Sequence, residues 1–330
     1  MVSAPAYDVV DFGSIQEGQT FVVRALNSLG HIVGGAGSFG RGHRALRLTR
    51  TSLEDLEGFF GTDWSAALGQ NELGDVVGSS NTATAVRAFV RLRDGTIRDL
   101  GALPGDNGSE ALGINRQGEA VGYSSGPRGV QAVLWDRQGA IQALGVLPGG
   151  DGSRAVALND AGDVAGTSTR LRSNRAFLWT RGGGMQDLGT LPGDTGSEAI
   201  GINNRTDVIG HSSGPGGDRA VLWPRGGSPQ NLGTLPGGDH SRALAVNERG
   251  DVVGVSTSAS GLRAFLWTRA GGMQDLNASL PPGSNFVLSK AVGINNQGEI
   301  VATGHEDQGH GDGHGNHDAP TRVVLLVPRP

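Results

Sequence analysis

One asparagine recurs along the chain at an almost constant interval, and this repeat limits the possible folds more than any other feature. Five intervals measure 44 residues and the last measures 48, which gives seven copies: Asn27, Asn71, Asn115, Asn159, Asn203, Asn247 and Asn295. Each copy lies in a frame close to I-N-x-x-G-D-V-V-G-x-S, followed by R-A-F-L-W and D-L-G-x-L-P-G. Self-similarity at a period of roughly 20–50 residues is typical of repeat architectures.

Each repeat has the pattern of four short strands. In the copy around Asn247, residues 241–247 and 251–257 flank one turn, and residues 263–269 and 273–276 flank a second turn that contains glycines. Asparagine and glycine at this spacing favour a tight hairpin with one residue at positive φ. β-Branched residues fill the segments between the turns, and helical periodicity is absent. We therefore predict four antiparallel strands per repeat.

Four strands in roughly 40–45 residues indicate a propeller blade, so seven copies predict an all-β, seven-bladed β-propeller with four-stranded antiparallel blades. We expect a single domain over residues 1–330 and number the blades one to seven after the asparagines. Residues 8–15 resemble an isolated fourth strand, and the last strand pattern, 322–327, resembles a third strand without its fourth. The N-terminal strand should complete blade seven at residues 288–328 and close the ring, which removes free sheet edges. A β-solenoid, the alternative, would not need complementary ends.

Charge and hydropathy exclude several kinds of partner. The formal net charge is −5 and no segment is rich in lysine or arginine, so we expect no nucleic-acid partner. No apolar stretch has the length of a membrane span, and the first residues lack the pattern of a signal peptide. We expect a soluble monomer without a membrane partner, cytoplasmic as written. The absence of cysteine also suits a mature secreted repeat protein, so secretion stays open if a leader was removed.

The motifs of the repeat are similar to those of a known family. The run A-F-L-W-T-R-G-G-G-M-Q-D-L-G-T-L-P-G at 176–193 resembles the HAF family of bacterial repeat proteins, which carry H-A-F-L-W-T, D-L-G-T-L-P-G-G and I-N-x-x-G-x-V-V-G-x-S runs. Gln131, Arg175 and Arg263 stand here where that family usually has histidine. The resemblance covers nearly the whole chain. It implies a propeller-like fold and often export, and it brings no catalytic motif.

The loops of a propeller alternate between its two faces. The loops that follow the second and fourth strands of each blade share one face, which we name the upper face, and the asparagine turns lie on the opposite, lower face. Variable loops on a repeated scaffold are where binding usually resides. The L-P-G loops between blades and the S-S-G loops within blades are the variable ones, so we expect a ligand site on the upper face.

Charged residues recur near the start of the first strand, which should be innermost. In residues 196–203, a period of two places Ser197 and Ala199 toward neighbouring blades and Glu198 toward the central channel. The equivalent residues from blade one to blade seven are Val22, Ala66, Glu110, Arg154, Glu198, Arg242 and Lys290. The alternating signs predict either an inter-blade ring of ion pairs or a ligand clamp formed by Glu110, Arg154, Arg242 and Lys290.

The alternation of charge fails in blades seven, one and two, where the upper loops are also irregular. Aromatic residues and His43 gather in these loops: Phe39, Phe59, Phe60, Trp64 and Phe286. They predict an apolar pocket or a sugar-stacking wall, with Trp64, Phe286 and His43 as ligand-binding residues and local loop packing as the alternative. The tryptophans that end the third strands are instead predicted to pack between blades: Trp135, Trp179, Trp223 and Trp267.

Histidine and tyrosine supply candidates for acid–base chemistry. Tyr123 and His211 occupy equivalent places near the upper end of a second strand, and His240 lies in a loop that joins two blades. We predict His211, Tyr123 and Glu198 as catalytic candidates and His240 as a ligand-binding residue, because histidine titrates near neutral pH. The alternative is that these histidines are packed or surface residues.

A histidine-rich segment at 304–320 contains His305, His310, His314 and His317. These side chains predict a possible divalent metal site, although their spacing matches no strong motif, and a glycine-rich loop with adventitious metal affinity is the alternative. No cofactor is required by any motif.

We predict that the protein binds a small molecule or carbohydrate at the central funnel of the upper face. An enzyme of lyase, cyclase or hydrolase type in small-molecule biosynthesis, using the same funnel, is the first alternative. A protein-interaction platform is the second, by analogy with other propellers.

Overall fold

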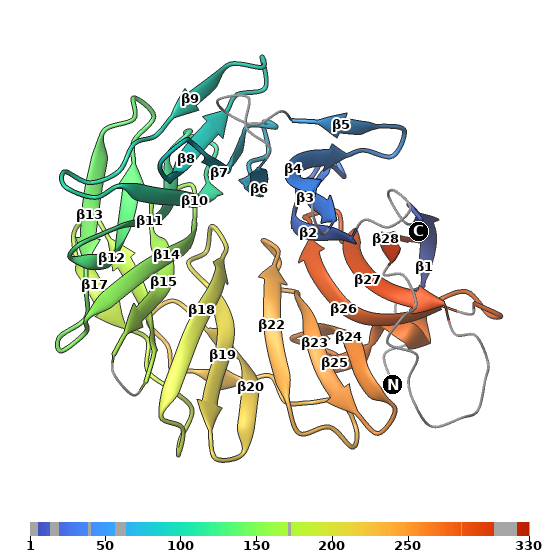
Figure 1. Ribbon diagram of the computed structural model, residues 1–330. Helices are drawn as coiled ribbons and strands as arrows, with labels where there is room; N and C mark the ends of the chain where they lie inside the picture. The colour runs from blue at the N-terminus through green and yellow to red at the C-terminus, as the bar shows by residue number, and fades with distance from the viewer. Residues whose placement is uncertain are drawn as a thin grey trace.

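The computed structural model describes residues 6–13, 20–38, 41–56, 64–170, 173–284, 286–306 and 322–329. These residues form seven four-stranded antiparallel sheets, arranged as the seven blades of a β-propeller (Figure 1). The predicted fold class is therefore confirmed.

Every blade runs outward from its first strand. Blades one to three contain β2 (Thr20–Leu26), β3 (Ile32–Ser38), β4 (Arg41–Leu48), β5 (Leu53–Asp55), β6 (Ser65–Gln70), β7 (Val76–Asn81), β8 (Val86–Arg91), β9 (Ile97–Asp99), β10 (Gly108–Ile114), β11 (Ala120–Gly126), β12 (Gly129–Trp135) and β13 (Ile141–Gly145). Blades four to six contain β14 (Gly152–Leu158), β15 (Val164–Thr169), β16 (Arg175–Thr180), β17 (Gly184–Asp187), β18 (Gly196–Ile202), β19 (Val208–Gly214), β20 (Gly217–Trp223), β21 (Gln230–Asn231), β22 (Ser241–Val246), β23 (Val252–Ser258), β24 (Gly261–Thr268) and β25 (Gly272–Asp275). A short 3₁₀ helix, η2 (Leu276–Ser279), leads to blade seven.

Blade seven is built from both ends of the chain. It contains β26 (Phe286–Ile294), β27 (Ile300–Glu306), β28 (Arg322–Pro328) and, as its outermost strand, β1 (Tyr7–Asp11). β1 pairs antiparallel with β28 from Tyr7 opposite Pro328 to Asp11 opposite Val324, which is the predicted closure of the ring.

The closing strand begins at Tyr7, one residue before the predicted range of 8–15, and β1 ends at Asp11; residues 14 and 15 of that range lie outside the described residues. Beyond Asp11 one more backbone bond forms, from the Phe12 N–H to the Val323 carbonyl. Gly13 then adopts φ +69° and donates its N–H to the Asp11 carboxylate. A residue at positive φ does not continue a regular strand, which agrees with the end of β1 before Gly13.

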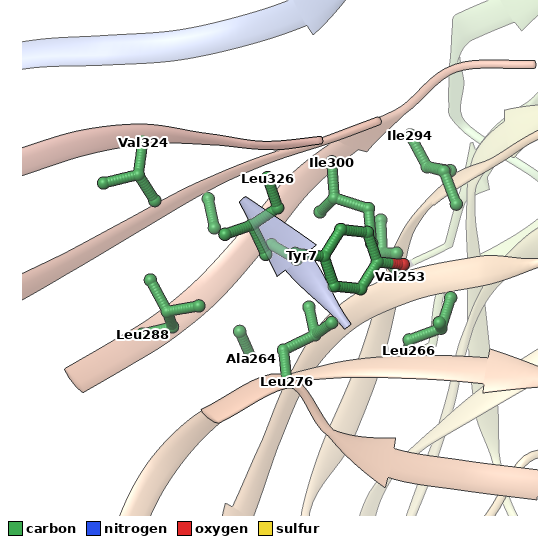
Figure 2. Close-up of a cluster of buried hydrophobic side chains, with 12 residues drawn as sticks. Tyr7, Val253, Ala264, Leu266, Leu276, Leu288, Ile294, Ile300, Val324 and Leu326 are labelled. Atoms are coloured by element: carbon green, nitrogen blue, oxygen red, sulfur yellow. The ribbon is translucent and has the colours of Figure 1, made fainter. Parts of the chain in front are cut away.

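Tyr7 anchors the closing strand in the core between blades six and seven. Its side chain is 3% exposed, and it packs in one buried cluster with Val253, Leu276 and Ile300 (Figure 2). Burial and the nearby Asp251 carboxylate raise the pKa of Tyr7 to about 12. The cluster therefore joins β1 to two blades at once.

The repeated asparagine connects neighbouring blades at the lower face. In blade five, the Asn203 Oδ1 accepts the backbone N–H groups of Arg205 and Asp207, while its Nδ2 donates to the Asn247 carbonyl of blade six at 3.1 Å. The same link to the next asparagine recurs in all seven blades at 3.0–3.4 Å. Blade five also confirms the positive-φ turn, where Thr206 adopts φ +63° in the place of the usual glycine.

Buried serines connect the blades near the upper face. The Ser197 Oγ accepts the Ala176 N–H of blade four at 3.1 Å, and equivalent bonds are made by Ser65, Ser109, Ser153 and Ser241. The four strand-ending tryptophans are 0–6% exposed and belong to clusters between blades, as predicted.

One feature of the first strands differs from the prediction. A one-residue bulge interrupts each of these strands at the same point, where two residues of the first strand face one residue of the second. The bulged residues are Arg24, Leu68, Leu112, Val156, Ile200, Leu244 and Val292. The assumed period of two is therefore wrong beyond residue 199 of β18.

Candidate functional site

Blades three and four meet at the upper mouth of the channel through a glutamate, a tyrosine and an arginine. Glu110 on β10 lies opposite Tyr123 on β11, and the Tyr123 hydroxyl donates to the Glu110 Oε1 at 2.5 Å. The Arg154 guanidinium of blade four lies over the Tyr123 ring, 4.4 Å from its centroid. Burial and the hydrogen bond to Glu110 raise the pKa of Tyr123 above its usual value, so the phenol stays protonated at neutral pH.

Blades five and six repeat this arrangement with histidine in place of tyrosine. Glu198 lies opposite His211, with 4.0 Å between the Glu198 Oε2 and the His211 Nε2. The other oxygen of Glu198 accepts the Asn174 amide at 2.6 Å. Arg242 on β22 pairs with Asp218 of blade five, with an Nε–Oδ2 distance of 2.7 Å. A glutamate, a tyrosine or histidine opposite it, and an arginine from the next blade therefore occur together twice around the upper mouth of the channel.

These contacts correct the expected ring of ion pairs. Within the described ranges, Glu198 and Arg242 do not pair with each other, because Glu198 accepts from Asn174 and Arg242 pairs with Asp218. Asn174 directly precedes the third strand of blade four, and Asp218 lies on the third strand of blade five. The expected ring was built from first-strand residues alone. An ion pair between blades five and six does form, but its carboxylate is Asp218 on a third strand and not Glu198 on a first strand.

His211 is a buried imidazole without full hydrogen bonding. The residue is 4% exposed, and its Nδ1 is buried without a hydrogen-bond partner in the described part of the chain. Burial first, and then the Arg242 charge, lower the pKa of His211 below 6.5, against the opposing effects of Glu198 and Asp218. The imidazole is therefore neutral at pH 7 and able to accept a proton.

A cavity of about 470 Å³ opens at the upper end of blades four and five. Its polar side chains include Arg154, Glu198 and Asn174, together with Asp151, Ser153, Thr167 and Thr169, and Val130, Val156 and Ile200 supply apolar surface. Glu198 has 39% of its side chain exposed, and Arg154 is exposed as well. The cavity therefore places a cation, a carboxylate and an aliphatic wall beside one another, and its volume suits a small organic ligand.

On the opposite side of the propeller, the structure places a cationic side chain, Arg24, that was not predicted from the sequence. Arg24, the bulged residue of β2 in blade one, is exposed, whereas the bulged residues of the other blades are partly buried aliphatics. Burial and the positive charges of Arg24 and Arg242 lower the pKa of Lys290. The 44-residue alignment contains the signal, since Arg24 is the one charged residue in its column.

The predicted aromatic sector is only partly assembled. His43 and Trp64 lie together, with 6.2 Å between ring centroids. Phe286 instead packs partly against the core between blades six and seven, with the Arg322 guanidinium 5.6 Å from its ring. Phe39, Phe59 and Phe60 lie outside the described residues.

Two further described histidines, His240 and His305, do not line this cavity. His240 is exposed, and its Nδ1 lies 2.8 Å from the Asp239 Oδ1. His305 lies on β27 opposite Val287, and His310, His314 and His317 lie outside the described residues. No group of three or more histidine, aspartate or glutamate side chains in the described ranges is arranged to hold a metal ion. The metal site therefore stays a prediction.

The lower mouth of the channel holds a second cavity of about 380 Å³. Its carboxylates already have partners: the Asp160 carboxylate accepts the Arg116 N–H at 3.0 Å, and the Asp160 N–H donates to Asn204 at 2.8 Å. Glu72 and Glu248 accept backbone N–H groups of the preceding blade in the same way. These groups stabilise the ring, so the upper mouth is the better candidate for a ligand site.

Comparisons with known proteins give a fold rather than a function. No family model and no curated protein matches the chain, so the resemblance to the HAF family stays a prediction. No helix among the described residues is long and apolar enough to cross a membrane.

Several solved propeller structures are similar. Virginiamycin B lyase from Staphylococcus aureus, as a catalytically inactive histidine-to-alanine variant with quinupristin, has a TM-score of 0.61 at 12% identity, over 98% of this chain and 100% of that chain. An acylaminoacyl peptidase from Pyrococcus horikoshii has a TM-score of 0.58 at 8% identity, over 97% of this chain and 52% of its own. TolB from Acinetobacter baumannii has a TM-score of 0.50 at 11% identity, over 78% and 62%. The chain thus spans less than two thirds of TolB and of the peptidase, and at these identities the likeness shows the fold alone.

Proposed function

We propose that this propeller binds a small polar organic molecule or carbohydrate at the upper mouth of its channel. The observation that carries the proposal is the cavity of about 470 Å³ in which Arg154 and Glu198 face the same space. Propellers commonly use the axial mouth, where loops of several blades converge, and this cavity has the size and mixed polarity of a ligand pocket.

The two charged groups are held in place before a ligand arrives. Arg154 is stacked on the Tyr123 ring, and Glu198 is fixed by the Asn174 amide. A guanidinium presents several N–H donors to a carbonyl or carboxylate, and a carboxylate accepts from hydroxyl or amino groups. The complementary ligand therefore has acceptors at one end and hydroxyl or amino donors at the other. Preorganised side chains reduce the entropy lost on binding.

A thermal-shift screen tests this proposal with monosaccharides, amino sugars and hydroxylated carboxylic acids. Compounds that stabilise the wild type should lose their effect in the Glu198→Gln and Arg154→Met variants. Arg225→Met, at an exposed arginine in a lower-face turn, should retain it. Stabilisation that survives in both cavity variants would place the ligand elsewhere and reject the proposal.

An acid–base enzyme of lyase type is the second candidate, favoured by His211. A neutral buried imidazole beside a partly exposed carboxylate is suited to remove a proton from a bound substrate. The proposal is supported by analogy with virginiamycin B lyase, whose histidine-to-alanine variant is catalytically inactive.

Substitution of His211 separates catalysis from binding. His211→Gln should abolish turnover of a ligand found in the screen and change its affinity little, whereas His240→Gln, at the exposed histidine, should leave turnover unchanged. Turnover that persists in His211→Gln would exclude His211 as the base.

A further inference from the structure

Three neighbouring blades each place a cation on their innermost strand. Lys290 of blade seven occupies the register of Glu198 in blade five, since it lies opposite Thr303 as Glu198 lies opposite His211. Arg242 holds the same register in blade six, opposite Val255. β22, β26 and β2 of blades six, seven and one follow one another around the channel (Figure 1).

Arg24 occupies the bulge position of blade one. In blades four and five the equivalent residues, Val156 and Ile200, line the upper cavity together with Arg154 and Glu198. By the equivalence of the blades, Arg24 lies in the channel wall below the position of Val22. Arg24 therefore lies two residues further along its strand than the register of Lys290, and its charge acts on that amine.

The three cations carry more positive charge than their neighbours neutralise. In the described part of the chain, Asp218 is the one carboxylate that pairs with any of them, through Arg242. The mutual repulsion is consistent with the lowered pKa of Lys290. Concentrated like charge in a recessed channel costs free energy and attracts counter-ions.

The fold itself does not need an arginine at position 24. Six other blades form the same bulge with an aliphatic residue: Leu68, Leu112, Val156, Ile200, Leu244 and Val292. Arg24 thus adds charge without a structural requirement, which points to a ligand.

We propose that Arg24, Arg242 and Lys290 form an anion subsite for a carboxylate or phosphate group of the channel ligand. The inference rests on the proposed function and refines it, since the ligand is then an acidic small molecule. Its acidic group binds in the sector of blades six, seven and one, and its hydroxyl or amino groups face Glu198 across the channel. Charge-assisted hydrogen bonds from two or three cations supply the affinity.

Isothermal titration with inorganic phosphate and with succinate, at constant ionic strength, tests the subsite and distinguishes the two anion types. Each anion that binds the wild type should bind at least about tenfold more weakly to Arg24→Leu and to Lys290→Met, because each variant removes one charge-assisted contact. Arg24→Leu restores the residue type of the other blades and should fold normally. Arg225→Leu, with the same loss of charge on the lower face, is the matched control.

The outcomes separate this inference from the proposed function. Equal affinity in the wild type and Arg24→Leu, or an equal loss in Arg225→Leu, overturns the subsite as a specific site. No binding of either anion to the wild type also overturns it, even where a ligand that depends on Glu198 still binds. Anion binding that persists in Glu198→Gln and fails in Lys290→Met supports the subsite, whether or not the Glu198 cavity has a ligand.

The pH dependence of binding provides a second readout. Phosphate or succinate affinity should fall as pH rises through the pKa of Lys290, which burial and the neighbouring arginines lower below the ordinary 10.5. Arg24 and Arg242 are the charged groups that act on Lys290, and Arg242 is paired with Asp218. Lys290→Arg should remove the decline, and a decline that persists in that variant contradicts the assignment.

Discussion

The Asn295 side chain donates its Nδ2 hydrogen bond to the backbone carbonyl of Asn27 at 3.2 Å, which joins the last repeat to the first. The same Nδ2 also donates to the Glu299 carboxylate at 2.7 Å, and the Oδ1 accepts the backbone N–H groups of Gln297 and Glu299. One buried side chain therefore shapes its own turn and closes the ring of inter-blade contacts.

We expect Asn295→Ala to reduce the free energy of unfolding by about 2–4 kcal/mol, because several hydrogen bonds are lost at a buried site and some partners are left unsatisfied. Denaturant unfolding measures the change. Gln297→Ala, at an exposed position of the same turn, should stay within about 0.5 kcal/mol of the wild type. Similar effects for the two variants would show that the inter-blade bond contributes little.

Tyr7→Ala should destabilise the protein by about 3–5 kcal/mol, the usual cost of removing a large aromatic side chain from a core. The loss should open the ring at β1, and limited proteolysis near residues 6–13 would detect this opening. Tyr7→Phe keeps the buried ring and should cost much less. A small loss of stability in Tyr7→Ala would mean that backbone pairing with β28 is sufficient for closure.

The raised pKa of Tyr7 predicts a loss of stability at alkaline pH. The folded-state pKa of about 12 lies above the ordinary tyrosine value of 10.0. The contribution is therefore complete below pH 10 and lost as pH rises from 10 toward 12, because the unfolded chain releases the proton first. Melting temperatures of the wild type should fall more steeply over this range than those of Tyr7→Phe, and parallel curves would contradict the prediction.

His211 predicts the opposite behaviour in acid. Its folded-state pKa is below the ordinary 6.5, so the unfolded chain takes up the proton first and stability falls as pH drops below about 6.5. His211→Gln cannot take up this proton, and its unfolding free energy should depend less on pH between pH 7 and pH 5. An unchanged pH dependence would show that protonation of His211 is not linked to unfolding.

The upper cavity can be filled to test its role without removing a charge. Val156→Phe places a ring at the bulge position in the cavity wall, so ligand binding should be lost while the melting temperature changes by only a few degrees. Leu68→Phe, at the equivalent bulge of blade two, which is not part of that wall, should bind normally. Ligand binding that survives in Val156→Phe would exclude the cavity.

The repeat made the architecture predictable, because seven asparagines at a fixed spacing define both the strands and the number of blades. Ring closure followed from the strand patterns at residues 8–15 and 322–327. The bulges were not predictable, since a period of two fits the short strands before and after Ile200 equally well. Their position depends on how the first and second strands twist against each other.

The candidate site was predicted less completely than the fold. The residues around Glu198 and His211 were identified because the alignment places them in register. Asn174 and Asp218 stand 44 residues apart in one column of the alignment, and they were missed because the first-strand register alone does not show that the start of the third strand reaches the same site. Arg24 was not among the predicted residues, although the alignment marks it as the one charged residue in an otherwise aliphatic column.

The pairing of β1 with β28 has a consequence for the synthesis of the protein. β1 stays unpaired until β28 has been made, because β28 is its one neighbour in the sheet of blade seven. Loss of β1 would expose the outer edge of β28, whereas loss of β28 would leave β1 without a partner and expose the edge of β27. Molecules that have lost β1 or β28 should therefore be recognisable by their tendency to associate through the unpaired strand edges.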